Sequence, residues 1–141
     1  MNQLEQAIRI ALDAHAGVVD KSGQPYILHP LTLMLQMETE EERITAVLHD
    51  VVEDSDISLD DLARLGFPTQ VLEALELLTH DRDTLPYLDY VAAISTNPLA
   101  RTVKLADLQH NMDIRRLPLE LTEADLQRLA TYRQAWELLH H

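Results

Sequence analysis

The sequence predicts an all-α protein, with roughly seven to nine helices bundled into a single domain over residues 1–141. Three observations support this fold class. Apolar residues recur at spacings of three and four along most of the chain. Helix-capping signatures precede several of these runs, and no segment shows the apolar–polar alternation typical of strands. With 46% hydrophobic residues and only 3 glycines, the chain is expected to form a compact core.

The N-terminal region predicts two helices separated by a loop. The first apolar stripe at helical spacing consists of Leu4, Ile8, Ala11 and Leu12. Gly17 lies where a helix C-cap is expected, and residues 17–28, which are rich in Gly, Ser, Asp and Pro, are expected to form a loop. His29 is expected to end this loop, because the following Pro30 disfavours α geometry at His29 and suits the first turn of a new helix.

Capping boxes mark the starts of three later helices. In each, a hydroxyl N-cap is followed three residues later by an acid; the pairs are Thr39 with Glu42, Ser58 with Asp61, and Thr122 with Asp125. The first of these helices is expected to continue without a break through Val51. The second is expected to be short and to end near Gly66, and the third to form the last helix of the chain.

Prolines set the remaining boundaries. Pro68 is expected to begin a helix, residues 79–86 form a polar loop that ends at Pro86, and the next helix breaks at Asn97. A helix is then predicted over roughly 99–115. Its polar stripe, at i, i+3 and i+7, consists of Lys104, Asp107 and Asn111.

Composition excludes several classes of function. The formal net charge is −13, which argues against a nucleic-acid-binding surface but allows a small phosphorylated ligand if a few cations converge on one pocket. There are no cysteines, so disulfides, thiolate zinc sites and cysteine nucleophiles are excluded. No apolar stretch is long enough to span a membrane and no signal-peptide pattern is present, so a cytoplasmic protein is expected. No heptad stripe predicts an oligomer.

The densest set of chemical groups lies in segment 48–54. There, His49, Asp50, Glu53 and Asp54 are interspersed with Leu and Val. Burying such groups is costly unless they are paired or bound to a metal. This segment is therefore the first candidate for a functional site.

Two further polar residues in apolar surroundings extend this site. Together with His29 and Asp107, the neighbours His49 and Asp50 supply two imidazoles and two carboxylates. Such a mixed nitrogen and oxygen set suits Mn²⁺, Fe²⁺ or Zn²⁺ better than Ca²⁺ or Mg²⁺. A buried hydrogen-bonded network of the same residues without metal is also compatible with the spacing, and the residues alone leave both interpretations open.

Glu53 and Asp54 are the candidate catalytic residues. Acidic side chains at a helix C-terminus oppose the helix dipole at a cost of about 0.3–1 kcal/mol, so stability alone does not favour them. Beside a bound cation, one carboxylate could accept a proton from water while the other orients that water. The alternative is a solvated acidic turn.

Several cations are candidates for phosphate binding. Lys104 is the strongest, because it lies one turn from Asp107 on the same predicted face. The others are Lys21, Arg101, Arg115 and Arg116. The remaining histidines, His15, His80 and His110, are expected to be capping or half-buried polar residues, and the aromatic residues Tyr87, Tyr90, Tyr132 and Trp136 are expected to belong to the core.

Four ordered motifs carry a family resemblance: Ala14–Gly17, Lys21–Pro30, His49–Asp54 and Lys104–Met112. In this order the chain resembles the HD-superfamily hydrolase domain of the RelA/SpoT alarmone enzymes. It is most similar to the stand-alone small alarmone hydrolases, a group that includes the metazoan SpoT homologue. The resemblance covers roughly residues 3–139 and implies an HD-domain helical bundle.

The resemblance also implies a site and a reaction. One Mn²⁺ would be held by His29, His49, Asp50 and Asp107, with Zn²⁺ or Fe²⁺ as alternatives. Glu53 and Asp54 would assist attack by water. The expected substrate-binding residues are Lys21, Ser22, Lys104 and Asn111. The family reaction removes the 3′-diphosphate of (p)ppGpp and gives GDP or GTP and pyrophosphate.

The chain departs from the family pattern at three positions. Asp20 and Leu108 stand where the family usually has Arg, and Ile114 stands where it has Thr. Each lost charge-assisted contact could be worth about 1.5–3 kcal/mol, so the sequence leaves the identity of the nucleotide substrate open. The alternatives are an HD-domain phosphohydrolase acting on NADPH or a nucleoside monophosphate, or a catalytically weak domain that binds an alarmone or a partner protein.

Overall fold

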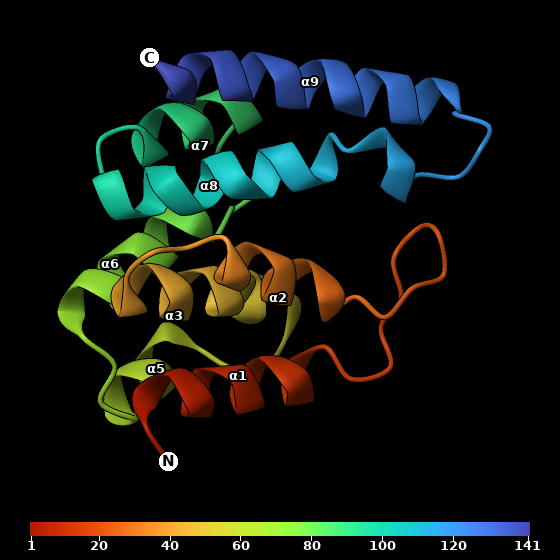
Figure 1. Cartoon of the computed structure of the whole chain (residues 1–141). Helices are drawn as coiled ribbons and strands as arrows, with labels where there is room; N and C mark the ends of the chain where they lie inside the picture. Colours follow the sequence, from red (N-terminus) through yellow and green to blue (C-terminus); the bar gives the residue numbers. More distant parts are fainter.

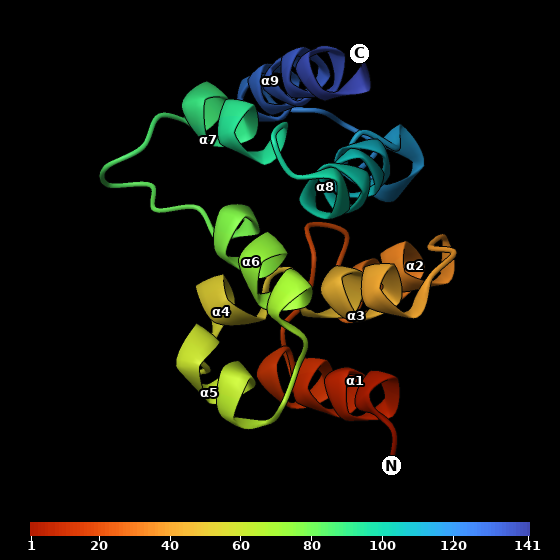
Figure 2. The same cartoon turned by 90° about the vertical axis from the view of Figure 1, so that its left-hand side faces the viewer.

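Three layers of helices are stacked along the molecule (Figure 1, Figure 2). The computed structural model describes all 141 residues, and its nine α-helices and one 3₁₀-helix confirm the predicted all-α class. The first layer contains α1 (Gln3–Ala14), α4 (Val51–Asp54) and α5 (Leu59–Arg64). The middle layer contains α2 (Leu28–Leu35), α3 (Glu40–Leu48) and α6 (Thr69–Leu78). The third contains α7 (Tyr87–Ile94), α8 (Pro98–Asn111) and α9 (Glu123–His140), and the 3₁₀-helix η1 (Ile114–Arg116) follows α8.

Two hydrophobic clusters hold these layers together. One joins the first and middle layers through fully buried residues such as Ala11, Leu48 and Val71. The other joins the middle and third layers through residues such as Leu33 and Ile94. The middle layer thus contributes to both clusters and is fixed from both sides. None of the helices combines the length and the apolar character that a membrane-spanning segment requires.

The predicted helix starts are confirmed by their caps. Thr39, Ser58 and Thr122 each accept a hydrogen bond from the backbone N–H three residues later, and the acid at that position accepts one from the backbone N–H of the cap residue. A further capping box, which the sequence interpretation did not use, joins Asn2 to Glu5 at the start of α1. These contacts satisfy N–H groups that the helix itself leaves unpaired.

The predicted unbroken helix through Val51 is wrong. α3 ends at Leu48, His49 is its C-cap, and Asp50 precedes α4. The imidazole of His49 donates from Nδ1 to the carbonyl of Ala46 at 2.7 Å. The backbone N–H of His49 donates to the same carbonyl at 3.4 Å. This local hydrogen bond competes with the regular helical pattern and separates α3 from α4.

Two other boundaries also differ from prediction. His29 already lies in the first turn of α2, where Pro30 is tolerated because the first N–H groups of a helix have no partner in the helix. α8 ends at Asn111, earlier than the predicted end near residue 115, because the Asp113 side chain caps the separate helix η1.

We expect Thr39→Ala to lower the free energy of unfolding by about 1 kcal/mol, because the first-turn N–H groups of α3 lose their side-chain acceptor. Urea denaturation measures this change. Thr102→Ala is the matched control, since it removes an exposed helical hydroxyl that caps nothing, and it should change the stability by less than about 0.5 kcal/mol. Equal effects of the two substitutions would contradict the capping role of Thr39.

Candidate active site

Four polar residues from different helices meet between the middle and third layers. His29 lies on the first turn of α2, and His49 and Asp50 lie at the break between α3 and α4. One ligand atom from each of these three residues lies within 4.8 Å of the other two. Asp107 reaches the group from α8: its Oδ1 is 2.8 Å from His29 Nε2 and 3.5 Å from His49 Nε2.

The chemistry of these atoms fits a divalent cation. Because His49 donates from Nδ1 to Ala46, its Nε2 carries a lone pair; that atom is buried and has no hydrogen-bond partner. It faces Asp50 Oδ2 at 3.0 Å and Asp107 Oδ1 at 3.5 Å, so acceptors point at one another. Ligand atoms around one ion with bonds of about 2.1 Å lie roughly 3.0–3.4 Å apart. The observed spacings are close to this range.

In the absence of a cation, a proton can relieve the same conflict. Burial alone would lower the pKa of His49, but the carboxylates of Asp50 and Asp107 outweigh it and hold that pKa well above its usual value. A proton on Nε2 then occupies the space between the three groups. A metal ion that binds at this site would therefore release a proton.

His110 supports His29 from behind. The two imidazole rings are stacked, with Nδ1 atoms 2.7 Å apart. Burial, the charge of Arg116 and the nearby His29 together lower the pKa of His110 to about 4, so its imidazole is neutral at pH 7. A neutral His110 can accept the Nδ1–H of His29, which leaves Nε2 of His29 for a cation. The sequence interpretation had treated His110 only as a polar residue.

Asp107 is held in place by its neighbours on α8. Lys104 Nζ lies 2.9 Å from Asp107 Oδ2, and Asn111 Nδ2 donates to Oδ1 at 3.0 Å. Burial would raise the pKa of Asp107, but Lys104 and the two histidines hold it well below its usual range. Lys104, which is only 9% exposed, also lies over the rings of Tyr87 and Tyr90. Its ammonium thus pairs with Asp107, and the residue also lines a cavity.

The two candidate catalytic carboxylates have different surroundings. Glu53 accepts the backbone N–H of His80 at 2.8 Å and pairs with Arg82 at 3.2 Å, so it anchors the loop of residues 79–86. Asp54 faces open space. Burial, followed by the charges of Asp50 and Glu53, raises its pKa to about 6.

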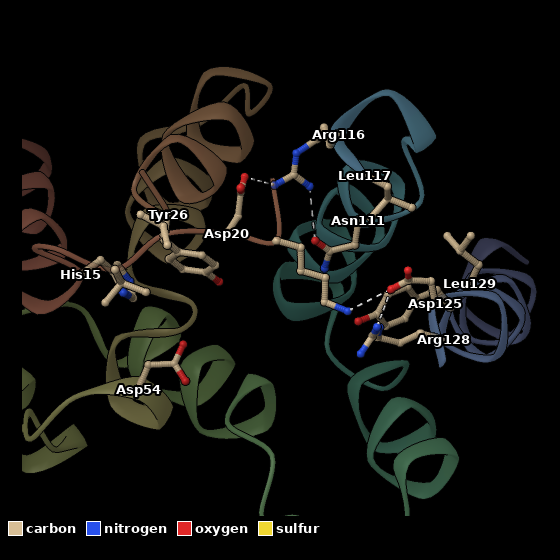
Figure 3. Close-up of a pocket in the computed structure, with 14 residues that line it drawn as sticks. His15, Asp20, Tyr26, Asp54, Asn111, Arg116, Leu117, Asp125, Arg128 and Leu129 are labelled. Carbon is tan, nitrogen blue, oxygen red and sulfur yellow. Dashed lines mark hydrogen bonds and ion pairs between the residues drawn. The ribbon is translucent and has the colours of Figure 1, made fainter. Parts of the chain in front are cut away.

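Two cavities adjoin this cluster. The larger, of about 550 Å³, lies between the loop before α2 and the helices α8 and α9 (Figure 3). The smaller, of about 270 Å³, is lined by Asp50 and Asp107, two of the predicted metal ligands. The two share four lining residues, Tyr26, Asp54, Asn111 and Tyr132. A ligand can therefore occupy both spaces at once.

The predicted substrate-binding residues are distributed unevenly around these cavities. Lys21 lines the larger one and pairs with Asp125 at 3.3 Å, and Asn111 lines both. Ser22 lines neither, because its hydroxyl donates to the carbonyl of Arg116 at 2.5 Å and holds the loop against η1. The sequence interpretation did not select Tyr26, which donates to Asp50.

Only one of the three departures from the family pattern faces a cavity. Asp20 lines the larger cavity beside Arg116. Leu108 is fully buried in the core, and Ile114 is exposed outside both cavities. In this fold, neither Leu108 nor Ile114 borders the space available to a ligand, which is compatible with the expected loss of nucleotide contacts at these two positions.

Comparisons with known proteins identify relatives by sequence. No family model matches the chain. It is 39% identical over 105 residues to the human guanosine-3′,5′-bis(diphosphate) 3′-pyrophosphohydrolase MESH1, an alignment that covers 66% of this chain and 57% of that protein. It is 32% identical over 127 residues to the bifunctional (p)ppGpp synthase/hydrolase SpoT of Escherichia coli strain K12, covering 79% of this chain and 18% of SpoT.

The fold is shared with a solved structure. A metazoan ortholog of SpoT, described as hydrolysing ppGpp and acting in starvation responses, superposes with a TM-score of 0.79 at 21% identity. The match covers 99% of this chain and 86% of that one. The chain thus spans little more than half of MESH1 and less than a fifth of SpoT, while its fold matches 86% of the metazoan ortholog's chain.

We expect Mn²⁺ at about 100 times its Kd to raise the free energy of unfolding by about 2.7 kcal/mol, because the cation binds only the folded cluster. Asp50→Asn should abolish most of this gain. Thermal unfolding with Mn²⁺ and with chelator measures the effect without any substrate. Asp56→Asn is the matched control, because Asp56 is exposed and outside the cluster. A full Mn²⁺ shift in Asp50→Asn would contradict the assignment.

Lys104→Met is expected to destabilise the metal-free protein by about 3–5 kcal/mol, because Asp107 would remain as a buried charge without its partner. The double variant Lys104→Met/Asp107→Asn should be more stable than Lys104→Met by about 1 kcal/mol or more, since no uncompensated charge remains. Denaturant titration of both single variants and the double variant gives the coupling energy. Additive losses would show that the ion pair does not hold Asp107 in place.

Proposed function

Because the chain is a homologue of the SpoT-type hydrolases, we propose that residues 1–141 form an HD phosphohydrolase domain that removes the 3′-diphosphate of ppGpp, giving GDP and pyrophosphate. One observation carries the proposal: the cation-binding cluster opens into a small cavity that is continuous with a larger one. The volume of the larger cavity, about 550 Å³, falls in the range of ligand sites in proteins. A nucleoside in the larger cavity would extend its 3′-phosphates toward the cluster.

One divalent cation is proposed at His29, His49, Asp50 and Asp107. Mn²⁺ is the first choice, and Zn²⁺ or Fe²⁺ would also suit two nitrogen and two oxygen ligands. When bound, such a cation neutralises phosphate charge and lowers the pKa of water. The protein's part is to keep the four ligands in place before the substrate arrives.

Asp54 is proposed as the proton acceptor. It lies where the two cavities meet, and its raised pKa of about 6 is close to neutral pH, as a general base requires. Glu53 would act beside it by keeping the loop of residues 79–86 against the site through His80 and Arg82. Asp54 would therefore accept the proton, and Glu53 would position the loop.

The diphosphate would lie in the smaller cavity. Arg82 and Lys104 line that cavity and supply positive charge, Arg82 from an exposed side chain and Lys104 from a buried one. The nucleoside would then contact Lys21 and Asn111 in the larger cavity. A small nucleotide, and no nucleic acid, is the partner that this strongly acidic chain suits, and the proposed place of action is the cytoplasm.

We expect Asp54→Asn to reduce kcat for pyrophosphate release from ppGpp by roughly 10²- to 10⁴-fold, because the amide cannot accept the proton. Mn²⁺ binding, followed by thermal shift, should persist in this variant. Asp56→Asn again serves as the control for a lost exposed charge. Unchanged turnover in Asp54→Asn would remove Asp54 from the mechanism.

The same assay separates the substrate classes. Mn²⁺-dependent release of pyrophosphate from ppGpp, absent with chelator, supports the proposal. Release of phosphate from NADPH or a nucleoside monophosphate in its place would assign the site to another nucleotide. Tight binding of ppGpp with no turnover would indicate a binding domain.

A further inference from the structure

An acid and a cation lie side by side on the wall of the larger cavity, away from the cation-binding cluster. Figure 3 shows Asp20 and Arg116 facing each other at one edge of this space. Arg116 Nη2 lies 3.9 Å from Asp20 Oδ2. This distance exceeds a normal hydrogen bond of about 2.7–3.2 Å, so each group keeps hydrogen-bonding capacity for a ligand.

Both side chains are held in place by the backbone around them. Asp20 Oδ1 accepts the N–H groups of Ser22 and Gln24, each at 2.9 Å, which leaves Oδ2 as the free oxygen. Arg116 donates from Nη1 to the carbonyl of His110 at 2.8 Å, and Nη2 remains beside Asp20. Asp20 and Arg116 are 20% and 23% exposed at the side chain. They thus present one free acceptor and one free donor at a fixed spacing.

Asp125, a second acid that lines this cavity, already uses most of its accepting capacity within the protein. Asp125 Oδ1 accepts from Lys21 at 3.3 Å and from Arg128 at 2.8 Å, and its Oδ2 accepts the N–H of Thr122. Asp125 is therefore held in the cavity wall by donors of the protein itself. Asp20 is left as the carboxylate that can accept new hydrogen bonds from a ligand at this edge.

We infer that Asp20 and Arg116 read the Watson–Crick edge of a guanine base in the larger cavity, an inference that rests on the proposed function. Arg116 donates to O6, and Asp20 Oδ2 accepts from N1–H and the adjacent 2-amino group. Adenine also presents one donor and one acceptor, but guanine offers the carboxylate two adjacent donors. Charge-assisted hydrogen bonds of this kind are the strong ones and give base selectivity.

Asp20→Asn tests the inference with little change in shape. The side-chain oxygen can still accept from Ser22 and Gln24, while a donor amide replaces the free oxygen Oδ2. This donor would face the N1–H and 2-amino donors of guanine, which cannot accept a hydrogen bond from it. Xanthine has a carbonyl oxygen in place of the 2-amino group, and that oxygen can accept one. The kcat/KM for guanosine 3′,5′-bis(diphosphate) should fall on the order of 10- to 100-fold, mainly through KM, and that for the xanthosine analogue should rise.

Two further variants complete the experiment. Arg116→Met removes the donor to O6, which both bases share, and should lower kcat/KM for both substrates by similar factors. Asp13→Asn, an exposed acid on α1 that lines neither cavity, should leave the ratio of the two substrates unchanged. An unchanged ratio in Asp20→Asn, with activity retained, would overturn the inference while leaving the proposed hydrolase intact.

A binding measurement covers the case in which the proposed activity fails. Calorimetry with guanosine and xanthosine 3′,5′-bisphosphates needs no turnover. If the protein releases no pyrophosphate but prefers the guanosine ligand, and Asp20→Asn reverses that preference, the base-reading pair stands and the hydrolase proposal falls. Failure of the unsubstituted protein to prefer guanosine would overturn the base-reading role.

Discussion

The contact between Asp107 and Lys104 is the interaction on which the rest of the site depends. Asp107 is buried and ionised, and it remains so because Lys104 lies 2.9 Å from one carboxylate oxygen. The other oxygen then faces His29 and His49. The third layer of helices is thereby joined to the middle layer by charge as well as by apolar packing. Losing this pair would disturb the ligand geometry and the fold together.

The break between α3 and α4 gives the site its shape. In an unbroken helix, neighbouring residues would point in directions about 100° apart. Because the helix ends at His49, the side chains of His49 and Asp50 approach each other to 3.0 Å. The short helix that follows carries Glu53 and Asp54 to the smaller cavity. A local hydrogen bond from an imidazole to its own backbone thus places ligands and acids around one space.

Local signals in the sequence predicted most of the helices. The capping boxes at Thr39, Ser58 and Thr122 are confirmed, because a cap depends on residues three apart. The break at His49 could not be predicted in this way. The apolar spacing favours continuation of the helix, and no sequence pattern indicates the competing hydrogen bond from the imidazole. Leu108 shows the same limit: the family pattern marks this position as a lost ligand contact, but only packing shows that the residue lies in the core.

The sequence by itself determined which chemical groups are present: seven imidazoles, 24 carboxylate side chains, no thiols, and helices to carry them. Only the tertiary structure decided which groups meet. His29 and Asp107 are 78 residues apart yet lie 2.8 Å from each other, and Asp20 faces Arg116 across a comparable separation in sequence. Such distances depend on how helices from three layers pack. Periodicity and capping report on neighbours within one helix, so they carry no information about these contacts.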